Sequence, residues 1–451
     1  MPIHTAHRCL AATLVALAGS TAAAGGGTVI NVPGDVPFLG DNEVFGTDTL
    51  IMLATGGSIG DFLTLEQNSV LNVDGGTLGE GLTLFDNAAA ALVSGSIGNG
   101  IFVDDFGIIQ MSGGTLGASG IVQGFGTLEV AGGTVGDALL VRGGGTLELT
   151  GGSVGNFTMA EGESLVDVDG GHLGDDFSAS GDALVRLSSG SIGGRFTAAG
   201  VSLTTITGGM IGQSMTATDD ALVNVDGGSI GAFAEVSGRA VCRVDGGSLG
   251  DAFTVSGDGW LEVRSGTAGA SGVMLGGGAL IIDGGTVGDS LLMTDGTLTI
   301  RRGTLGASAF VQAGTVTIAG GDVGAGFFAS GGVIEWHGSQ FEIGGVPVTF
   351  SALNDAVVIP TRDVIISGSL DDRRDFSVDL NAGDFSAGAT LRLVFTSVRG
   401  DLDGDNDVDF DDLNAVVSTW GTSGPAGDAD GSGFVDFSDL NEVLQQWGVA
   451  W

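Results

Sequence analysis

Two runs of aspartates near the C-terminus have the residue types and the spacing needed to bind metal ions. The first run begins at Asp401, and the second begins at Asp428. In both runs oxygen-bearing residues occupy positions 1, 3, 5, 9 and 12 of a twelve-residue segment, which is the ligand spacing of an EF-hand calcium loop. Position 7 of such a loop supplies a backbone carbonyl. The predicted ligands are Asp401, Asp403, Asp405, Asp407, Asp409 and Asp412 in the first loop, and Asp428, Asp430, Ser432, Phe434, Asp436 and Asp439 in the second.

These ligand sets favour calcium, with one ion in each loop, because Mg²⁺ accepts fewer protein ligands and keeps several waters. The second loop has the expected Gly433 at position 6, and the first has Asn406, a residue type that tolerates the left-handed conformation. The competing interpretation is an acidic disordered tail. The repeat also extends past the loops, with Leu413-Asn414 recurring as Leu440-Asn441 and Trp420-Gly421 recurring as Trp447-Gly448. Two copies in register are hard to obtain from composition alone.

The paired loop–helix segments resemble a dockerin type I module, in the planctomycete-type variant with a Leu-Asn…Trp-Gly ending. The resemblance covers residues 400–448, roughly a tenth of the chain. It implies calcium-dependent folding and attachment to a cohesin-like domain or another cell-surface protein. Cellulosome dockerins carry Ser-Thr or similar small pairs at loop positions 10 and 11, whereas this chain has Phe410-Asp411 and Phe437-Ser438.

A glycine that recurs at a constant 19-residue step organises most of the chain ahead of these loops. The step holds from Gly60 to Gly288, and two steps that are one residue shorter then lead to Gly306 and Gly324. A strict period of this length is typical of stacked repeats, because one unit cannot bury its own apolar face.

Apolar residues recur at fixed places in this repeat and alternate with polar ones. The positions equivalent to Leu65 and Val73 are apolar in every coil, and the position of Asn72 between two apolar residues is mostly polar. Alternation with period 2 indicates strands. A glycine equivalent to Gly76 recurs at a corner where a positive φ is expected. We therefore predict a mainly β chain, a parallel β-solenoid of about fifteen 19-residue coils and roughly 70 Å in length.

Composition changes along the chain divide it into four parts. Residues 1–24 have basic residues, a short apolar run and a small-residue cleavage site, which together predict a signal peptide. Residues 25–336 form the predicted solenoid. Residues 337–398 lose the period and are expected to form a small antiparallel β module that caps it. Residues 399–451 form the dockerin-like calcium-binding domain.

The charge of the chain is strongly acidic, with a formal net charge of −40 and no lysine or tyrosine. Such a charge repels nucleic acid and anionic membranes, and it favours solubility and divalent cations. Cys242 is the one cysteine beyond the signal peptide, so no internal disulfide is possible there. Its inward column predicts a buried structural thiol.

Two groups of charged residues in the solenoid could belong to a polysaccharide lyase or an O-glycosyl hydrolase. The first group is Asp167, Asp169 and Arg186, and the second is Asp226, Asp245, Arg243 and Arg264. The simpler interpretation is a solvated outer face, and the equal coil lengths leave no long loops to build a cleft. His172 has no Ser/His/Asp arrangement around it. We therefore assign no catalytic residue and lean against an enzyme.

Two further columns can be interpreted in more than one way. The residue after the repeating glycine is often Asp or Asn, which favours turn capping over scattered calcium sites. The outward position of the first strand is apolar in four consecutive coils: Phe102, Ile121, Leu140 and Met159. This file is either a contact surface for a partner or a second copy, or a patch covered by a cap.

The sequence as a whole predicts a secreted protein, extracellular or at the cell surface, with a structural, adhesion or carbohydrate-associated role. One alternative is a polysaccharide-active β-helix enzyme. Another is a self-assembling surface or matrix protein.

Overall fold

The computed structural model describes residues 27–351, 354–396, 400–403, 407–423, 426–430 and 432–447. The predicted signal peptide and the predicted ligand Asp405 lie outside these residues. The chain divides into two compact units, one ending at Cys242 and the other beginning at Arg243, with Val236–Gly238 assigned to the second. No helix within the described ranges has the length and apolar character needed to cross a membrane.

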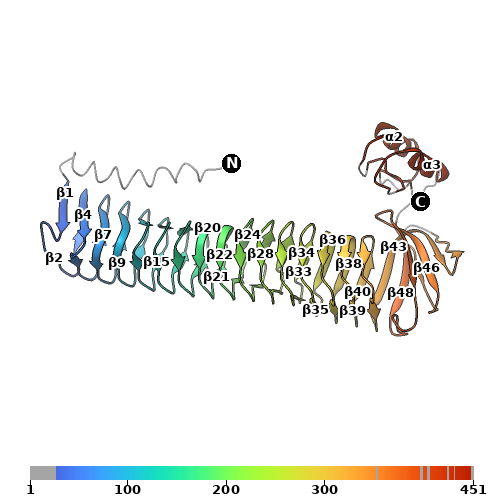
Figure 1. Cartoon of the computed structure of the whole chain (residues 1–451), viewed down its shortest axis with the longest axis horizontal. Coiled ribbons are helices and arrows are strands. Elements are labelled where there is room, and N and C mark those ends of the chain that lie inside the picture. The colour runs from blue at the N-terminus through green and yellow to red at the C-terminus, as the bar shows by residue number, and fades with distance from the viewer. Residues whose placement is uncertain are drawn as a thin grey trace. The chain divides into compact units, whose positions relative to one another are not determined.

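The predicted fold class is confirmed. The chain is mainly β and forms a parallel β-solenoid in which each coil contributes strands to two sheets (Figure 1). The smaller sheet has 16 strands, which gives about 16 coils. Its strands are β3 (Val44–Phe45), β6 (Thr64–Leu65), β8 (Thr83–Leu84), β10 (Phe102–Val103), β13 (Ile121–Val122), β16 (Leu140–Arg142), β19 (Met159–Glu161), β21 (Ser178–Ser180), β23 (Thr197–Ala198), β26 (Thr216–Ala217), β29 (Glu235–Val236), β32 (Thr254–Ser256), β35 (Val273–Leu275), β37 (Leu292–Met293), β39 (Phe310–Val311) and β42 (Phe328–Ala329).

The larger sheet takes the remaining strands of each coil. In the first unit these are β1 (Thr28–Val32), β2 (Phe38–Leu39), β4 (Thr49–Ala54), β5 (Ser58–Ile59), β7 (Val70–Leu78), β9 (Ala89–Ile97), β11 (Ile108–Met111), β12 (Thr115–Leu116), β14 (Thr127–Val130), β15 (Thr134–Val135), β17 (Thr146–Leu149), β18 (Ser153–Val154), β20 (Leu165–Leu173), β22 (Leu184–Ile192), β24 (Leu203–Ile206), β25 (Met210–Ile211), β27 (Leu222–Val225) and β28 (Ser229–Ile230). The later coils contribute β30 (Val241–Val244), β31 (Ser248–Leu249), β33 (Trp260–Val263), β34 (Thr267–Ala268), β36 (Ala279–Val287), β38 (Thr297–Leu305), β40 (Thr315–Ile318) and β41 (Asp322–Val323).

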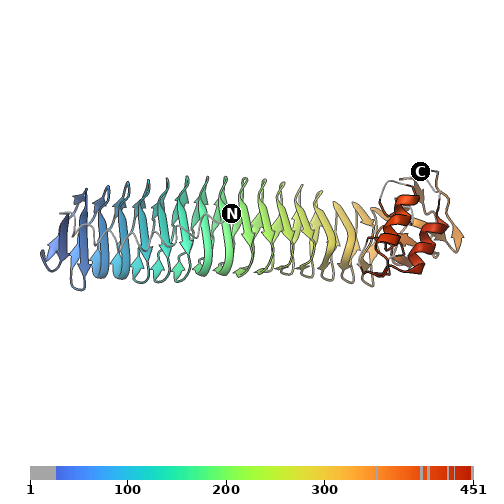
Figure 2. The same cartoon turned by 90° about the horizontal axis from the view of Figure 1, so that it is seen from above.

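The register of the stack follows the repeat of the sequence, because equivalent residues of neighbouring coils pair directly. Leu128 in β14, for example, pairs with Leu147 in β17, and both are fully buried. The polar position next to them pairs in the same way, Glu129 with Glu148, and faces outward. The view in Figure 2 shows this repetition from coil to coil. Period-2 alternation thus separates a buried apolar interior from a polar exterior.

Most coils turn at a glycine with positive φ, as expected, although Gly266 and Gly285 at the equivalent corner do not have a positive φ. Gly152 has a φ of +70°, and a Cβ at this residue would lie 2.5 Å from the carbonyl oxygen of Gly133 in the preceding coil. A side chain is therefore excluded both by conformation and by the close stacking of the backbone.

A second left-handed position recurs in each coil and was not predicted. It lies two residues after the repeating glycine and is mostly occupied by residues other than glycine, such as Phe157 with a φ of 59°. There the amide donates forward, from Phe157 N–H to the Asp175 oxygen at 2.9 Å. Two residues later the amide of Met159 donates backward, to Leu139 at 2.8 Å. The left-handed residue therefore changes the direction in which the amides point along the stack.

The Asp and Asn column after the repeating glycine has the turn-capping role that we favoured. The Asp137 carboxylate accepts a hydrogen bond from the N–H of Asn156 in the next coil at 2.8 Å, and the Asn156 side chain accepts from Asp175 N–H at the same distance. Each side chain therefore satisfies a corner amide that no strand partner reaches.

The interior of the coils is apolar and tightly packed. Phe177 and Phe196 stack with ring centroids 5.2 Å apart, and both are fully buried. Cys242 is buried and free, and burial raises its pKa to about 12. The thiol therefore stays protonated and inert, as predicted for a structural cysteine.

The end of the second unit is a mixed β module rather than the purely antiparallel one that we expected. β43 (Val333–Ile343) continues from the last coil and pairs in parallel with β48 (Thr390–Phe395). Antiparallel pairs then join β43 to β44 (Val346–Pro347) and to β46 (Ile365–Leu370), β46 to β47 (Asp375–Asp379), and β48 to β45 (Ala356–Val358). The parallel pairing was missed because β48 joins the stack only after the rest of the module, a separation much longer than one coil.

Two helices follow the module, α2 (Phe410–Ser418) and α3 (Phe437–Gln445). Their inward residues form one small apolar cluster, with Val416 from α2 and Val443 from α3 both fully buried. Phe395 at the end of β48 belongs to the same cluster. The helical segment therefore shares its apolar core with the β module.

Candidate metal-binding site

Each helix follows an aspartate-rich loop directly in the sequence, and aspartates of that loop cap the helix N-terminus. Asp409 is the N-cap of α2 and accepts a hydrogen bond from Asp411 N–H, while the Asp412 carboxylate accepts from Asp409 N–H at 2.8 Å. Asp436 and Asp439 form the same capping box at the start of α3. The Asp-x-x-Asp spacing signals such a box in the sequence, so these predicted metal ligands also cap the helices.

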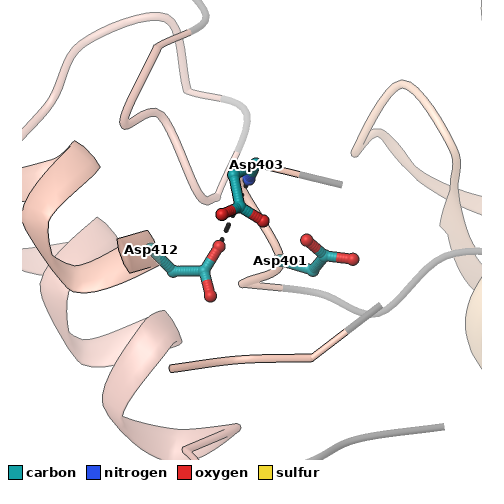
Figure 3. Close-up of side chains that lie close together, drawn as sticks. All are labelled: Asp401, Asp403 and Asp412. Atoms are coloured by element: carbon teal, nitrogen blue, oxygen red, sulfur yellow. Dashed lines mark hydrogen bonds between the residues drawn. The ribbon is translucent and has the colours of Figure 1, made fainter. Parts of the chain in front are cut away.

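The first loop gathers two overlapping carboxylate groups around Asp412. Oxygens of Asp401, Asp403 and Asp412 lie within 4.8 Å of one another, and so do those of Asp407, Asp409 and Asp412. Asp412 is fully buried, and its Oδ1 accepts hydrogen bonds from Leu402 N–H and from Asp403 N–H. Figure 3 shows the hydrogen bond between Asp403 and Asp412. Through these hydrogen bonds, Asp412 in the first turn of α2 holds the first residues of the loop close to its last residues.

The second loop gathers Asp428, Asp430 and Asp439, whose carboxylate oxygens also lie within 4.8 Å of one another. Asp428 is buried, with 7% of its surface exposed. Its Oδ2 accepts a hydrogen bond from Gly433 N–H at 2.9 Å, whereas its Oδ1 is buried with no hydrogen-bond partner among the described residues. A buried carboxylate oxygen without a partner costs free energy unless something else compensates its charge.

Two aspartates of this loop, Asp428 and Asp430, have pKa values that are shifted in opposite directions. Burial raises the pKa of Asp428, and the nearby carboxylates of Asp439 and Asp430 raise it further, against the Gly433 hydrogen bond and the positive charge of Arg373. Burial also acts to raise the pKa of Asp430, but hydrogen bonding from Ser432 acts in the opposite direction, and the net pKa is lowered. Arg373 of the β module donates a hydrogen bond to the backbone carbonyl of Asp428. A cation in the loop would remove the unfavourable charge at Asp428.

Of the remaining predicted ligands of the second loop, Ser432 and Phe434 lie next to each other, whereas Asp436 lies apart from the aspartate group. The Ser432 hydroxyl lies 3.2 Å from the backbone oxygen of Phe434, so that the oxygens of positions 5 and 7 are neighbours. Gly433 between them has a φ of +88°, as position 6 requires. Asp436 is exposed and uses Oδ1 to cap α3, outside the group formed by the other three aspartates.

These geometries support a coarse conclusion: three aspartate groups in the C-terminal segment could hold a metal ion. In the first loop, all predicted ligands within the described residues belong to one of two groups that share Asp412. In the second loop, the aspartates at positions 1, 3 and 12 meet.

The two charged groups singled out in the solenoid differ in the structure. In the second group, Arg264 pairs with Glu262 at 3.0 Å and with Asp245 at 3.5 Å, and Arg243 pairs with Glu262 at 3.4 Å. Glu262 lies in the same polar column as Arg243, outside the group singled out in the sequence, and pairs with both arginines. Arg243, Arg264 and Asp245 therefore form an ion-pair network with Glu262 on the outer face of the solenoid.

The first group lines a hollow of about 390 Å³ on the outer face of the larger sheet. Arg186 has no ion-pair partner within the described ranges, although it pairs backbone to backbone with Asp167 in β20. The Asp169 carboxylate accepts a hydrogen bond from the Ser188 hydroxyl at 2.6 Å. His172 contacts Ser191 at 2.9 Å in the Ser/Thr column, consistent with a substituted turn residue. The residues lining the hollow are Asp167, Asp169, Arg186, Leu187, Ser188, Thr205 and Thr207.

In comparisons with known proteins, no family model, curated protein or solved structure matches this chain.

Proposed function

We propose that this chain is a secreted, calcium-binding structural or adhesion protein, attached through its C-terminal module, whose solenoid presents an extended surface. The observation that carries the proposal is the second aspartate loop. It ends on a capped helix and contains a buried Asp428 oxygen with no hydrogen-bond partner among the described residues. A calcium ion is the group that would compensate this oxygen.

Calcium, with one ion in each loop, fits the donor set. All the side chains that converge in these loops offer hard oxygens, the preferred ligands of Ca²⁺. Twelve acidic residues and no arginine lie between Asp401 and Trp451, so the segment repels itself when no cation is present. Calcium would bind mainly through the aspartates at positions 1, 3 and 12, with Ser432 and the Phe434 carbonyl beside them.

A role in attachment is supported by the exposed faces of the two helices. Equivalent positions of α2 and α3 expose large apolar side chains, and Phe410 and Phe437 are 67% and 70% exposed. The residue seven positions further along lies on the same helix face, and an exposed tryptophan follows just beyond the end of each helix. The exposed pairs are Phe410 with Phe437, Val417 with Leu444, and Trp420 with Trp447. We propose that a cohesin-like or cell-surface protein binds this duplicated apolar face.

Calcium titration of the full chain by calorimetry tests the proposal. The wild-type protein should bind about two calcium ions, and Asp428→Asn or Asp439→Asn should remove one of them. Asp411→Asn removes the same charge at an exposed site outside the carboxylate groups and should bind like wild type. No heat of binding at millimolar calcium, or equal losses in all three variants, would refute the calcium site.

A polysaccharide-active enzyme is the second candidate, and the hollow at Asp167, Asp169 and Arg186 is the observation that favours it. A guanidinium without an ion-pair partner in the described ranges, beside two carboxylates, could act on an acidic or hydroxyl-rich sugar. Incubation with a panel of polysaccharides, followed by an assay for new reducing ends, tests this candidate. Activity should be lost in Arg186→Gln and kept in Arg301→Gln, an exposed arginine elsewhere in the solenoid.

A further inference from the structure

A hollow of about 390 Å³ lies within the second unit, where the last coil of the solenoid meets the β module. It is lined by β41, by β47 and by the buried aromatic residues Phe327, Trp336 and Phe385. The hollow forms because β43 leaves the stack. β43 pairs with β40 as far as Trp336, and from Gly338 onward it pairs with β46. The hollow therefore occupies the place beside β41 where a further coil would otherwise lie.

The edge of β47 that faces away from β46 has unpaired backbone groups. The two strands pair in an antiparallel register. Leu370 N–H donates to the Arg374 oxygen near one end of the pair, and Leu380 N–H donates to the Val364 oxygen at the other, both at 2.9 Å. Because hydrogen-bonded residues alternate along an antiparallel pair, the N–H and C=O of Ser377 point away from β46. Ser377 lines the hollow, and neither backbone group has a hydrogen-bond partner in the described part of the chain.

The edge of β41 that faces away from β38 also lies beside the hollow. β41 pairs with β38 of the preceding coil, where Gly324 N–H donates to the Leu305 oxygen at 2.8 Å. Val323 takes the place of Leu305 one coil further on, so its backbone groups point away from β38. Val323 lines the hollow and is partly exposed, whereas Leu305 and Val287 at the same position of the preceding coils are fully buried. The hollow therefore leaves the end of an inward column partly uncovered.

The side chains of β47 indicate what kind of strand would fit beside it. Phe376 and Val378 are partly buried on one face, whereas Asp375, Ser377 and Asp379 are exposed on the other. Apolar pairs and opposite charges on neighbouring strands stabilise a sheet, and like charges destabilise it. A matching segment therefore alternates apolar and basic residues.

The other charges around the hollow favour the same kind of segment. They belong to Asp322, Asp384 and Arg374. Arg374 pairs with Asp322 at 3.0 Å and with Asp372 at 3.4 Å, so its positive charge is already compensated. A second copy of this chain, with a net charge of −40 and no lysine, is a poor match for this acidic site. The charges therefore favour a different, basic partner.

We propose that the hollow binds an extended segment of a basic partner protein, which pairs with β47 as an additional strand. Main-chain hydrogen bonds to the free edge give such a complex its affinity, and pockets for alternate side chains give its specificity. The apolar side chains of the segment cover Val323 and lie beside Phe376, and its basic side chains lie beside Asp375 and Asp379. The proposal goes beyond calcium binding and attachment, because its residues belong to the β module and the last coil.

The test measures binding of a fluorescein-labelled octapeptide of alternating valine and lysine to the full chain, by fluorescence anisotropy in buffer containing calcium. The wild-type protein should bind this peptide. The same octapeptide with every backbone amide N-methylated keeps its side chains and charge but has no N–H to donate, and it should bind at least about tenfold more weakly. An octapeptide of alternating valine and glutamate should also bind at least about tenfold more weakly, because the aspartates repel it.

Substitutions on β47 separate the backbone from the charge. Ser377→Pro removes the outward N–H without removing a bond to β46, and edge strands tolerate proline at such positions. It should weaken binding at least about tenfold, whereas Ser377→Ala keeps the N–H and should bind like wild type. Asp379→Asn should weaken binding about threefold, as expected for one exposed ion pair. The matched control is Asp258→Asn, at an exposed solenoid turn outside the hollow, which should bind like wild type.

Hydrogen exchange of the wild-type chain locates the bound peptide without any substitution. The valine–lysine peptide should slow exchange in the segment that contains Ser377 and Asp379. Protection confined to other segments would overturn the proposal, and so would the absence of binding at millimolar peptide. Equal binding of the N-methylated peptide would also overturn it, because charge alone then accounts for the affinity. Ser377→Pro with wild-type circular dichroism and undiminished binding would have the same consequence.

Discussion

The solenoid and the C-terminal loop–helix segment are both built from repeats rich in aspartate, but they use the carboxylates in opposite ways. In the solenoid, Asp137 lies at an exposed corner and its Oδ1 accepts the N–H of the next coil. In the second loop, Asp428 is buried, and its Oδ1 has no partner among the described residues. The same side chain is a backbone cap where solvent screens its charge, and a candidate metal ligand where burial leaves that charge uncompensated.

The two regions also differ in what holds them together. The coils bury continuous apolar columns and pair their backbones in register, so their stability comes from packing and strand pairing. The loop–helix segment has two nine-residue helices, one small apolar cluster and a large excess of acidic residues. Its proposed calcium ions should therefore contribute much of its folding free energy.

Removal of calcium is expected to have the largest effect and to act on one region only. Chelation should unfold residues 400–447, because the carboxylates then repel one another without a cation. Hydrogen exchange measured by mass spectrometry should show lost protection there and unchanged protection in the coils, with recovery on adding calcium. Full protection of α2 and α3 in the chelator would show that the two regions do not differ in this way.

A substitution in the solenoid core should lower the stability of the solenoid and leave the loop–helix segment unchanged. Leu187→Ala removes a side chain that is 1% exposed inside the solenoid. A cavity of this kind costs about 2–5 kcal/mol of unfolding free energy. Urea denaturation followed by β-type circular dichroism measures the loss. Val93→Ala, at an exposed position, should unfold at nearly the same urea concentration as wild type. Altered calcium affinity in Leu187→Ala would show that the two regions are coupled.

Substitutions of Asp137 test whether the solenoid corners need a hydrogen-bond acceptor or a negative charge. Asp137→Asn should be nearly neutral, because Asn156 already performs the same capping role in the next coil. Asp137→Ala should cost about 0.5–1.5 kcal/mol, since it leaves a corner amide without its acceptor. Denaturation of both variants checks this pair. An equally large loss in Asp137→Asn would mean that the corner requires negative charge, as the calcium loops are proposed to do.

Loss of the exposed ion pairs at acidic pH should have the smallest effect on the stability of the solenoid. Arg195 lowers the pKa of Asp176 by hydrogen bonding, and Arg239 lowers that of Asp220 in the same way. A lowered folded-state pKa contributes stability above the unfolded pKa of about 3.9, and this contribution is lost as the pH falls through the folded value. Both pairs are exposed, so Asp176→Asn should flatten the acid limb of the melting temperature only slightly. A shift near neutral pH would contradict this assignment.

The sequence alone determined the features that depend on local alternation and on the repeat length. Its period specified the parallel solenoid, the inward columns, the glycine corners and the outward file from Phe102 to Met159. The spacing of the aspartates located the two candidate loops. Such features are visible in one dimension because neighbouring coils are equivalent, so a column in the sequence is a column in space.

Tertiary structure alone decided the features that depend on which particular side chains meet. Glu262 pairs with both Arg243 and Arg264, whereas Arg186 has no ion-pair partner within the described ranges, although the two sites look alike in the sequence. β48 returns to pair with β43 across the whole intervening module, outside any period. Asp436 caps a helix, while Asp428 is buried with one oxygen lacking a partner among the described residues. Burial and partner choice depend on how the chain packs in three dimensions, and residue spacing does not encode them.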